Sequence, residues 1–479
     1  MAKLAGRITD SETGETVSAR VNVTDATGKF LHPIDSLLKI GPGTSFFYSS
    51  GSFEIDVPRG RVRVIVERGT EYIPIGLDIE ASSQGTVTAD VQLKRWSKLG
   101  TEGWHPGNTH IHYDEKEKRP DDRLHLDPRV EDLRMTAVSI LKRWDLEYAS
   151  NKYSPGLMTD FTSAHHYVQC GEESRHNAEG SHSPGYGHIM LLNIKNVVEP
   201  VSRGLLVDAF DPDYPPLSYA CDDTHRQGGI VIWCHNGLGM EAPVAAALGK
   251  VDAFNLFDPH WMDPEYDIYY KMLNAGIRLP ASTGSDWFIS SGNRVYAYTG
   301  EDFEYEPWLA ALKQGRTFIT NGPSLSLSIQ GEKPGAEIEA RPGESLPSLV
   351  TWQSHYPISH VELLFNGDVI VRKTLEVEMS TGSLEADIPA RCDGWVAARL
   401  WSTARDSFAQ PIFAHTSPIY LKTGLEGPEK IAAATYFNQA IDESLKWVGT
   451  KGKFYTDNQR REVVDLFREG QQVYKRIIH

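Results

Sequence analysis

The sequence predicts a multidomain α/β protein in which a central region of alternating strands and helices is flanked by two β-rich regions. Three patterns support this prediction. Short strand candidates separated by turns fill residues 1–98 and again residues 324–424. Apolar runs alternate with amphipathic stretches over residues 99–323, and residues 425–479 have helical periodicity. At 479 residues the chain exceeds one ordinary core, so several domains are expected.

The composition excludes several classes of protein. Hydrophobic residues make up 40% of the chain, which is typical of a folded soluble protein, and the formal net charge is −16. This acidic balance argues against nucleic acid as a partner. No apolar run is long enough for a membrane span, and the four cysteines include no CxxC pair, so neither a zinc ribbon nor a disulfide framework is indicated. The sequence does not decide whether the protein is cytoplasmic or is exported with its leader peptide removed.

The N-terminal region, residues 1–98, is predicted to be a small β-sandwich. Turn residues such as Thr13-Gly14 and Pro58-Arg59-Gly60 separate its strand candidates. These candidates are residues 7–10, 19–24, 52–57, 62–67 and 86–93. The stretch 6–14, with 19–23, resembles the transthyretin-like, carboxypeptidase-regulatory modules, and this resemblance implies a structural or docking role.

The central region, residues 99–323, has the pattern of an α/β barrel or a parallel sheet. Six apolar runs are predicted as buried strands: 135–141, 168–170, 188–194, 229–234, 253–257 and 279–283. Three amphipathic stretches are predicted as helices: 216–227, 242–248 and 266–275. In both kinds of fold the functional residues lie where strands end.

Histidines and carboxylates follow these strands repeatedly. His110 and His112 stand one residue apart, and on a strand their side chains point to the same side, as two ligands of one metal ion would. Glu173, His235 and Asp286 each come shortly after a predicted strand. Such groups are costly to bury unless they are paired or bind a metal. The alternative for the His-x-His pair is a surface or hydrogen-bonded pair.

Six motifs in order resemble the PHP (polymerase and histidinol phosphatase) superfamily of metallohydrolases, in its carbaryl-hydrolase-like (CehA/McbA) branch. They are Asn108-Thr109-His110-Ile111-His112, Gly171-Glu172-Glu173, Gly187-His188, residues 228–235, Gly284-Ser285-Asp286 and residues 315–323. The resemblance implies a distorted seven-stranded β/α barrel with a metal cluster at the carboxyl ends of its strands. It also implies six metal ligands: His110, His112, Glu173, His188, His235 and Asp286.

These ligand types suit zinc first, with manganese or iron as alternatives. The resemblance implies that metal-bound water cleaves an ester, amide or carbamate bond of a small-molecule substrate. Two other functions stay open: a metal-dependent phosphoesterase, and a non-catalytic binding or scaffold protein, for example for glycans, with a degraded barrel.

The chain departs from the family pattern at two places. The strand 136–141 runs into Lys142-Arg143-Trp144-Asp145 instead of Thr-Asp-His, and Phe288 stands two residues after Asp286 where the family often has histidine. Two usual ligands are therefore missing. One metal ion is favoured over two, with a second, weaker site as the alternative.

Three further residues are candidates for catalysis. Lys142 and Arg143 would hold a substrate anion or stabilise an oxyanion, or else form surface ion pairs. His176 would act as an acid/base or an extra ligand, or else be a hydrogen-bonded loop histidine.

Other polar and aromatic residues carry weaker predictions. Residues 121–127 are predicted as a solvated loop. His165, His166 and His182 either line the mouth of the site or are ordinary loop histidines. Four tryptophans form either an aromatic pocket or core: Trp144, Trp233, Trp261 and Trp287.

The C-terminal third is predicted as a second β-sandwich, residues 324–424, followed by a helical hairpin, residues 425–479. Asn366-Gly367 between apolar runs is a strong hairpin signal. The first helix has one apolar face, and the second starts at a capping box, Thr456-x-x-Gln459. The helical hairpin is expected to pack either on the central region or at a contact between subunits. In the second case the protein would be a homo-oligomer.

Overall fold

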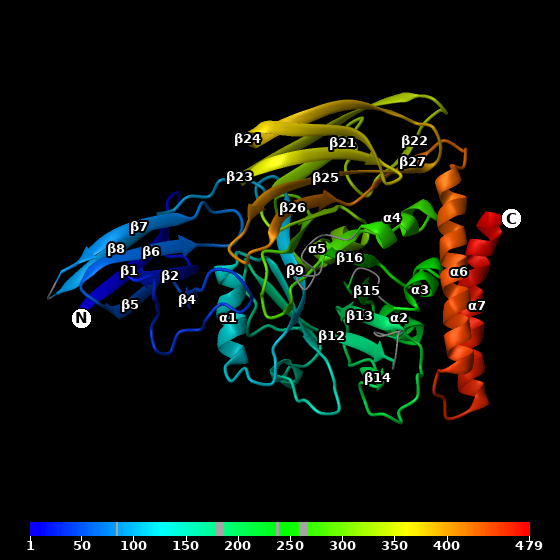
Figure 1. Ribbon diagram of the computed structural model, residues 1–479, viewed down its shortest axis with the longest axis horizontal. Helices are drawn as coiled ribbons and strands as arrows, with labels where there is room; N and C mark the ends of the chain where they lie inside the picture. The colour runs from blue at the N-terminus through cyan, green and yellow to red at the C-terminus, as the bar shows by residue number, and fades with distance from the viewer. Residues whose placement is uncertain (83–84, 179–184, 236–238, 258–265) are drawn as a thin grey trace.

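A computed structural model of the chain describes residues 1–82, 85–178, 185–235, 239–257 and 266–479. These residues form a mixed α/β protein with seven α-helices and large sheets, which confirms the predicted α/β class. The N-terminal sheets lie at one end, two long C-terminal helices stand at the other, and the second β-rich region covers the central part (Figure 1). No described helix is both long and apolar enough to cross a membrane.

The N-terminal region forms two sheets around one apolar core. One sheet has the order β5-β1-β8, and the other has β3-β2-β6-β7 with β4 on β2. The core includes Leu4, Val21 and Val64. The strands are β1 Ala2–Asp10, β2 Ala19–Asp25, β3 Phe30–Leu31, β4 Phe47–Ser49, β5 Ser52–Val57, β6 Gly60–Glu67, β7 Ile75–Ala81 and β8 Thr86–Leu93. The strands β3, β4 and β7 were not predicted, because β3 and β4 are very short and β7 is only half-buried.

The central strands carry the candidate ligands. They are β9 Trp104–His112, β10 Met135–Ile140, β11 Gly156–Leu157, β12 Tyr167–Asn177, β13 Gly187–Leu192, β14 Ser202–Gly204, β15 Ile230–Trp233, β16 Ala253–Phe257, β17 Ala281–Thr283, β18 Asp286–Trp287, β19 Arg294–Tyr298 and β20 Thr317–Thr320. All nine residues of β9 are buried, and β9 pairs with strands on both sides, so its two histidines lie in the interior.

The central sheet is mixed rather than wholly parallel. Its parallel pairs are β9–β10, β10–β12, β15–β16 and β16–β17, and β18 returns to pair with β9 in parallel. In contrast, β13 runs antiparallel to both neighbours, β12 and β15. A wholly parallel sheet, one of the two predicted arrangements, is therefore wrong here. The physical reason is the chain length between β12 and β13, which is too short for the crossover helix that a parallel pair needs.

Five helices belong to the central region: α1 Pro120–Val130, α2 Leu217–Arg226, α3 Ala242–Ala247, α4 Asp267–Asn274 and α5 Tyr305–Lys313, with a short 3₁₀ turn at Ala149–Lys152. The predicted solvated loop at 121–127 is wrong, because this segment lies in α1. Pro120 stands in the first turn with Asp121 and Asp122, which suit the helix dipole. The buried side chain of Arg123 donates to the carbonyl of Leu38, so α1 packs against the N-terminal region.

The second β-rich region contains β21 Ser324–Ile329, β22 Glu337–Glu339, β23 Ser345–Phe365, β24 Asp368–Pro389, β25 Gly394–Arg405, β26 Pro411–Thr416 and β27 Ile419–Lys422. Its strands surround an apolar core of their own. The predicted Asn366-Gly367 hairpin is confirmed: Phe365 pairs with Asp368, and the two turn residues have φ of +51° and +92°. Both values lie in the left-handed region that this turn type requires.

The two C-terminal helices are α6 Pro428–Thr450 and α7 Asp457–Ile478, and they lie side by side (Figure 1). The capping box is confirmed, because the Thr456 hydroxyl accepts from the Gln459 amide and the Gln459 side chain accepts from the Thr456 amide. Helix α7 packs on α3, where the Tyr474 hydroxyl donates to the Pro243 carbonyl at 2.7 Å. The hairpin is thus docked on the central region.

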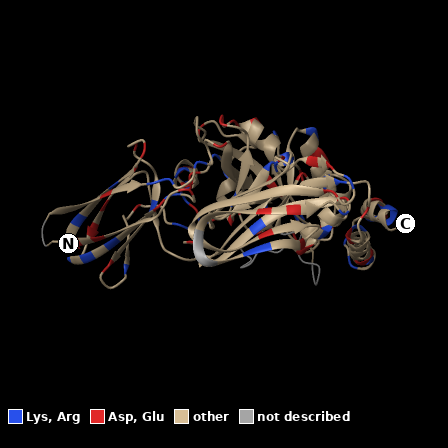
Figure 2. Ribbon diagram, turned by 90° about the horizontal axis from the view of Figure 1, so that it is seen from above, with Lys and Arg blue, Asp and Glu red and all other residues tan. Residues whose placement is uncertain are grey.

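Basic and acidic residues are interspersed along the molecule (Figure 2). Both signs of charge are present on the N-terminal sheets, in the central region and on the C-terminal helices in that view.

Candidate metal centre

The two histidines of β9 converge on one point, as the sequence predicts. Their Nε2 atoms lie 3.0 Å apart. The Nδ1 atom of His112 lies 2.9 Å from the Ser139 carbonyl, which can only accept, so this nitrogen carries the proton. In the form of His112 with a single ring proton, the lone pair is therefore on Nε2 and points towards His110. Burial lowers the pKa of His110 to about 4, so the His110 ring is neutral at neutral pH.

Glu173 lies between two groups of histidines. Its Oε2 atom is 3.0 Å from His112 Nε2, and its Oε1 atom is 3.1 Å from His188 Nδ1 and 3.5 Å from His235 Nε2. Burial raises the pKa of Glu173, but Arg175 and the three histidines outweigh burial and hold the pKa well below its usual range. The side chain is therefore a buried carboxylate with one oxygen for each histidine group.

His188 is oriented by a residue that the sequence did not point to. Its Nε2 atom donates to the Asn177 Oδ1 atom at 2.8 Å, which leaves the lone pair on Nδ1. Nδ1 is buried, has no hydrogen-bond partner among the described residues and faces the Glu173 carboxylate. Two acceptors this close need a cation or a proton between them. Burial lowers the pKa of His188 to about 4, which favours the cation at neutral pH.

Asp286 is brought to β9 by the chain that follows β17. Its Oδ1 atom is 3.4 Å from His110 Nε2 and 3.8 Å from His112 Nε2. Backbone bonds from Ser285 to the His110 carbonyl and from Phe288 to the His112 carbonyl fix this segment. Asp286 has φ of +60° and His235 has φ of +55°, a left-handed conformation that is strained for residues other than glycine. Strain of this kind is often concentrated at functional sites.

Gly284 allows β9 to approach this segment. A Cβ atom at position 284 would lie 2.4 Å from the His110 Cβ and 2.8 Å from the His110 backbone nitrogen. Neither contact can be relieved by rotating a flexible side chain. The spacing between His110 and Asp286 therefore depends on this glycine.

Gly284→Ala is expected to weaken metal binding by about tenfold or more, because it displaces β9 while leaving every ligand in place. The measurement is a metal titration in competition with a chromogenic chelator. Gly449→Ala in α6 is the matched control, since a Cβ there meets no atom within 4 Å. An unchanged metal affinity in Gly284→Ala would contradict the role given to this contact.

The described residues form three overlapping groups of potential ligands. Within each group the ligand atoms lie within 4.8 Å of one another. The groups are His110 with His112 and Asp286, Glu173 with His188 and His235, and His110 with Glu173 and Cys234. All six side chains predicted as ligands are thus brought together. Cys234 was missed, because the sequence analysis assigned it only as the last residue of a buried strand.

No family model and no curated protein matches the chain. The donor set itself is therefore the basis for assigning chemistry to the cluster. Imidazole nitrogens, carboxylate oxygens and one buried thiol are the ligands that zinc, manganese and iron take in proteins. Four of the six predicted ligands are buried, His188 and His235 are partly exposed, and the ligand atoms face one another at short distances, so these residues fit a divalent cation.

His176 lies outside the three ligand groups. The strand β12 runs on to Asn177, so Glu173, Arg175 and Asn177 share one side and His176 faces the other. Its Nε2 atom donates to Asp213 at 2.7 Å, its Nδ1 atom accepts from the Tyr186 amide, and its ring stacks on Tyr186. Both ring nitrogens are therefore engaged in a buried hydrogen-bond network. The sequence analysis ended this strand at Cys170, which hid the alternation.

Lys142 and Arg143 form ion pairs at the surface. The Lys142 ammonium lies 2.9 Å from Glu199, and the Arg143 guanidinium lies 2.8 Å from Asp145. Both pairs are largely exposed. This is the arrangement that the second prediction for Lys142 and Arg143, surface ion pairs, described. Neither residue belongs to the ligand groups of the described chain.

The aromatic and histidine candidates have different positions. The Trp287 ring lies 5.5 Å from the His112 ring, whereas Trp233 is core and Trp144 is exposed. His165 is exposed, and His166 Nδ1 bonds the Leu133 carbonyl, so both are ordinary loop histidines. His182 and Trp261 lie outside the described residues.

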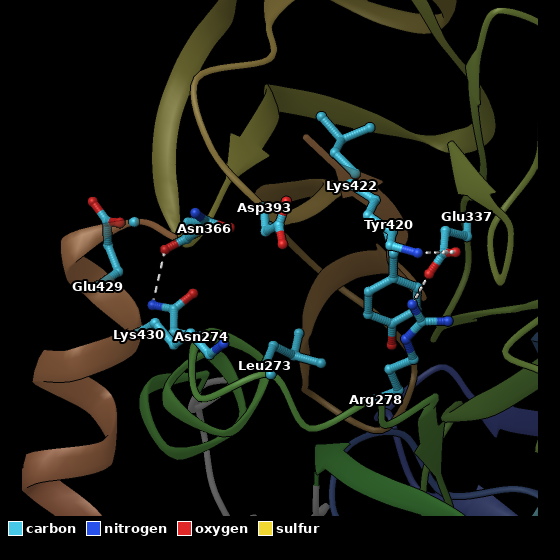
Figure 3. A pocket seen from close by; sticks show the side chains of 14 residues that line it. Leu273, Asn274, Arg278, Glu337, Asn366, Asp393, Tyr420, Lys422, Glu429 and Lys430 are labelled. Atoms are coloured by element: carbon cyan, nitrogen blue, oxygen red, sulfur yellow. Dashed lines mark hydrogen bonds and ion pairs between the residues drawn. The ribbon is translucent and has the colours of Figure 1, made fainter. Parts of the chain in front are cut away.

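A second candidate site is the pocket between α4, the start of α6 and the strands β22 and β27 (Figure 3). Its charged side chains pair with one another: Arg278 and Lys422 both contact Glu337. The Asn274 amide donates to the Asn366 carbonyl across its floor. None of the described residues that line it is histidine or cysteine. This pocket therefore offers weaker chemistry than the metal centre.

Proposed function

We propose that the protein is a metal-dependent hydrolase of the PHP superfamily, in the carbaryl-hydrolase-like branch. It cleaves an ester, amide or carbamate bond of a small organic substrate. The observation that carries this proposal is the position of Glu173, whose two oxygens face two different groups of histidines. A buried carboxylate shared in this way is suited to two neighbouring cations.

The residues suggest two cation positions. One would be held by His110, His112, Asp286 and one oxygen of Glu173. The other would be held by the second oxygen of Glu173 with His188 and His235. Zinc fits the histidine-rich first position best, and manganese or iron are the alternatives. The missing family histidines leave the second position with fewer ligands, so it is expected to be the weaker one.

Held by His110, His112, Asp286 and Glu173, a divalent cation would supply acidification of the attacking water and stabilisation of negative charge at the scissile bond. The protein's own residues hold and orient the reacting groups. Ser139 sets the proton position on His112, and Asn177 sets it on His188. Burial of Glu173 and His112 keeps bulk water from competing for the ligands.

The strand order supports the barrel and domain parts of this proposal. The pairings lead from β9 through β10, β12, β13, β15 and β16 to β17, and β18 leads back to β9. We propose that this is a distorted PHP-type barrel over residues 99–323. The sheets around separate cores support β-sandwiches at 1–98 and 324–424, with the helical hairpin at 425–479.

The test is metal content together with hydrolysis by the full-length protein. Mass spectrometry is expected to find about one or two transition-metal ions per chain, and His112→Ala is expected to lose the tighter one. Activity on p-nitrophenyl acetate and on an aryl N-methylcarbamate should disappear with a chelator and return with Zn²⁺ or Mn²⁺. His32→Ala, an exposed histidine of the N-terminal region, is the matched control.

Two results would contradict the proposal. Absence of metal after reconstitution would leave the non-catalytic binding protein as the better interpretation. Metal-dependent turnover of p-nitrophenyl phosphate that exceeds turnover of the carbon esters would favour the phosphoesterase.

A further inference from the structure

Arg175 is a buried cation beside the metal centre. It lies on β12 two residues after Glu173, so both side chains project from the same side of the strand. The residue is 8% exposed. Its backbone is held between β13 and β14 by pairing with His188 and Ser202, so its position is defined by the sheet.

Most of the hydrogen-bonding capacity of Arg175 is unused within the described chain. The Nη1 atom donates to Glu173 Oε2 at 3.3 Å. The Nε atom is buried and has no acceptor among the described residues. A guanidinium group has five N–H donors, and a buried donor without an acceptor is unfavourable. Nε–H and one Nη2–H point in the same direction, so an anion that accepts from Nε–H can also accept from Nη2–H.

The surroundings of Arg175 form a wall next to the cluster. Burial raises the pKa of Tyr148, and the positive charges of Arg175 and Arg143 oppose this rise. The Tyr148 ring lies 5.4 Å from the Trp287 ring, which in turn lies 5.5 Å from the His112 ring. Arg175 itself contacts the centre directly, since its Nη1 atom lies 3.3 Å from Glu173 Oε2.

The charges of the centre favour an anionic ligand. Glu173 and Asp286 are the carboxylates among its described ligand groups. Two carboxylates balance one divalent cation, so Arg175 and any second cation leave a net positive charge in a buried site. Such a charge is stabilised by an anionic group brought by the substrate.

We propose that Arg175 binds a carboxylate of the substrate through its Nε and Nη2 atoms. The substrate is then an ester, amide or carbamate that carries a free carboxylate near the bond to be cleaved. This inference rests on the proposed hydrolase function and names its substrate class. The paired donors of one guanidinium edge match the two oxygens of a carboxylate.

The test uses binding, which does not depend on turnover. The probes are the dicarboxylates from malonate to adipate, each compared with its monoamide, titrated calorimetrically into the metal-loaded protein. One carboxylate of each probe is available to the metal and the other to Arg175. At least one dicarboxylate is expected to bind about 10- to 100-fold more tightly than its monoamide. In Arg175→Met this preference should vanish, while the monoamide binds as before.

Three controls separate a binding role from a structural one. Metal content is measured for each variant, because an Arg175 variant that misfolds would lose its metal. Arg175→Lys keeps the charge without the paired donors and is expected to recover part of the preference. Arg226→Met removes an exposed arginine that pairs with Asp223 in α2, and it should leave the preference unchanged.

The failures of the two proposals are distinguishable. Metal-loaded protein that binds every dicarboxylate no better than its monoamide would overturn the Arg175 inference and leave the hydrolase intact. Inorganic phosphate that binds more tightly than any dicarboxylate, in an Arg175-dependent manner, would overturn the carboxylate assignment. Protein that cannot be loaded with metal would overturn the hydrolase, and the Arg175 inference with it.

Discussion

Glu173→Gln is expected to remove tight metal binding and to lower kcat/KM for hydrolysis by roughly 10³-fold. The side chain keeps its size, but one ligand oxygen becomes an NH₂ donor and the negative charge is lost. Since the two Glu173 oxygens face His112 on one side and His188 with His235 on the other, both cation positions are affected at once. Metal analysis and steady-state kinetics on the reconstituted protein measure the two effects.

Glu172→Gln is the matched control for this variant. Glu172 is the preceding residue of β12 and faces the other side, where its Oε2 atom accepts from the Val198 amide at 2.7 Å. Burial raises the pKa of Glu172 to about 8, so its carboxyl is mostly protonated at pH 7, and glutamine resembles that neutral form. Metal content and activity should stay near the wild-type values. Equal losses in the two variants would contradict the central role of Glu173.

Glu131→Gln is expected to lower the free energy of unfolding by about 3–5 kcal/mol. The Glu131 side chain is fully buried and joins two arginines from distant parts of the chain. Its Oε1 atom lies 3.3 Å from Arg20 of β2, and its Oε2 atom lies 3.1 Å from Arg294 of β19. Glutamine would remove the charge that pairs with buried Arg294 and would leave Arg20 with Glu67 as its remaining carboxylate partner, which is why the expected loss is large.

Urea unfolding followed by tryptophan fluorescence measures this effect. Glu54→Gln, which removes an exposed partner of Lys3, is the control and should leave the unfolding midpoint nearly unchanged. A shift in Glu131→Gln as small as in this control would show that the buried ion pairs contribute little. Glu131 is the C-cap residue of α1, and Arg20 of the N-terminal region pairs with it. The unfolding transition that shifts should therefore include the separation of the N-terminal region from the central region.

The local parts of the structure could be predicted from the sequence because their causes are local. Two histidines at i and i+2 must share a side of a strand, so the convergence of His110 and His112 follows from β9 alone. The Asn366-Gly367 turn and the Thr456 capping box also depend on a few adjacent residues. Each of these features is determined by the backbone conformation and hydrogen bonds of a few consecutive residues.

The arrangement of the metal centre was decided by the tertiary structure. His110, Glu173 and Asp286 come from strands far apart in the chain, and their distances depend on how those strands pair. The extension of β12 to Asn177 put Arg175 and Asn177 on the side of Glu173 and turned His176 away from it. A shift of one residue along a strand reverses the side that each residue faces, and only sheet pairing determines that register.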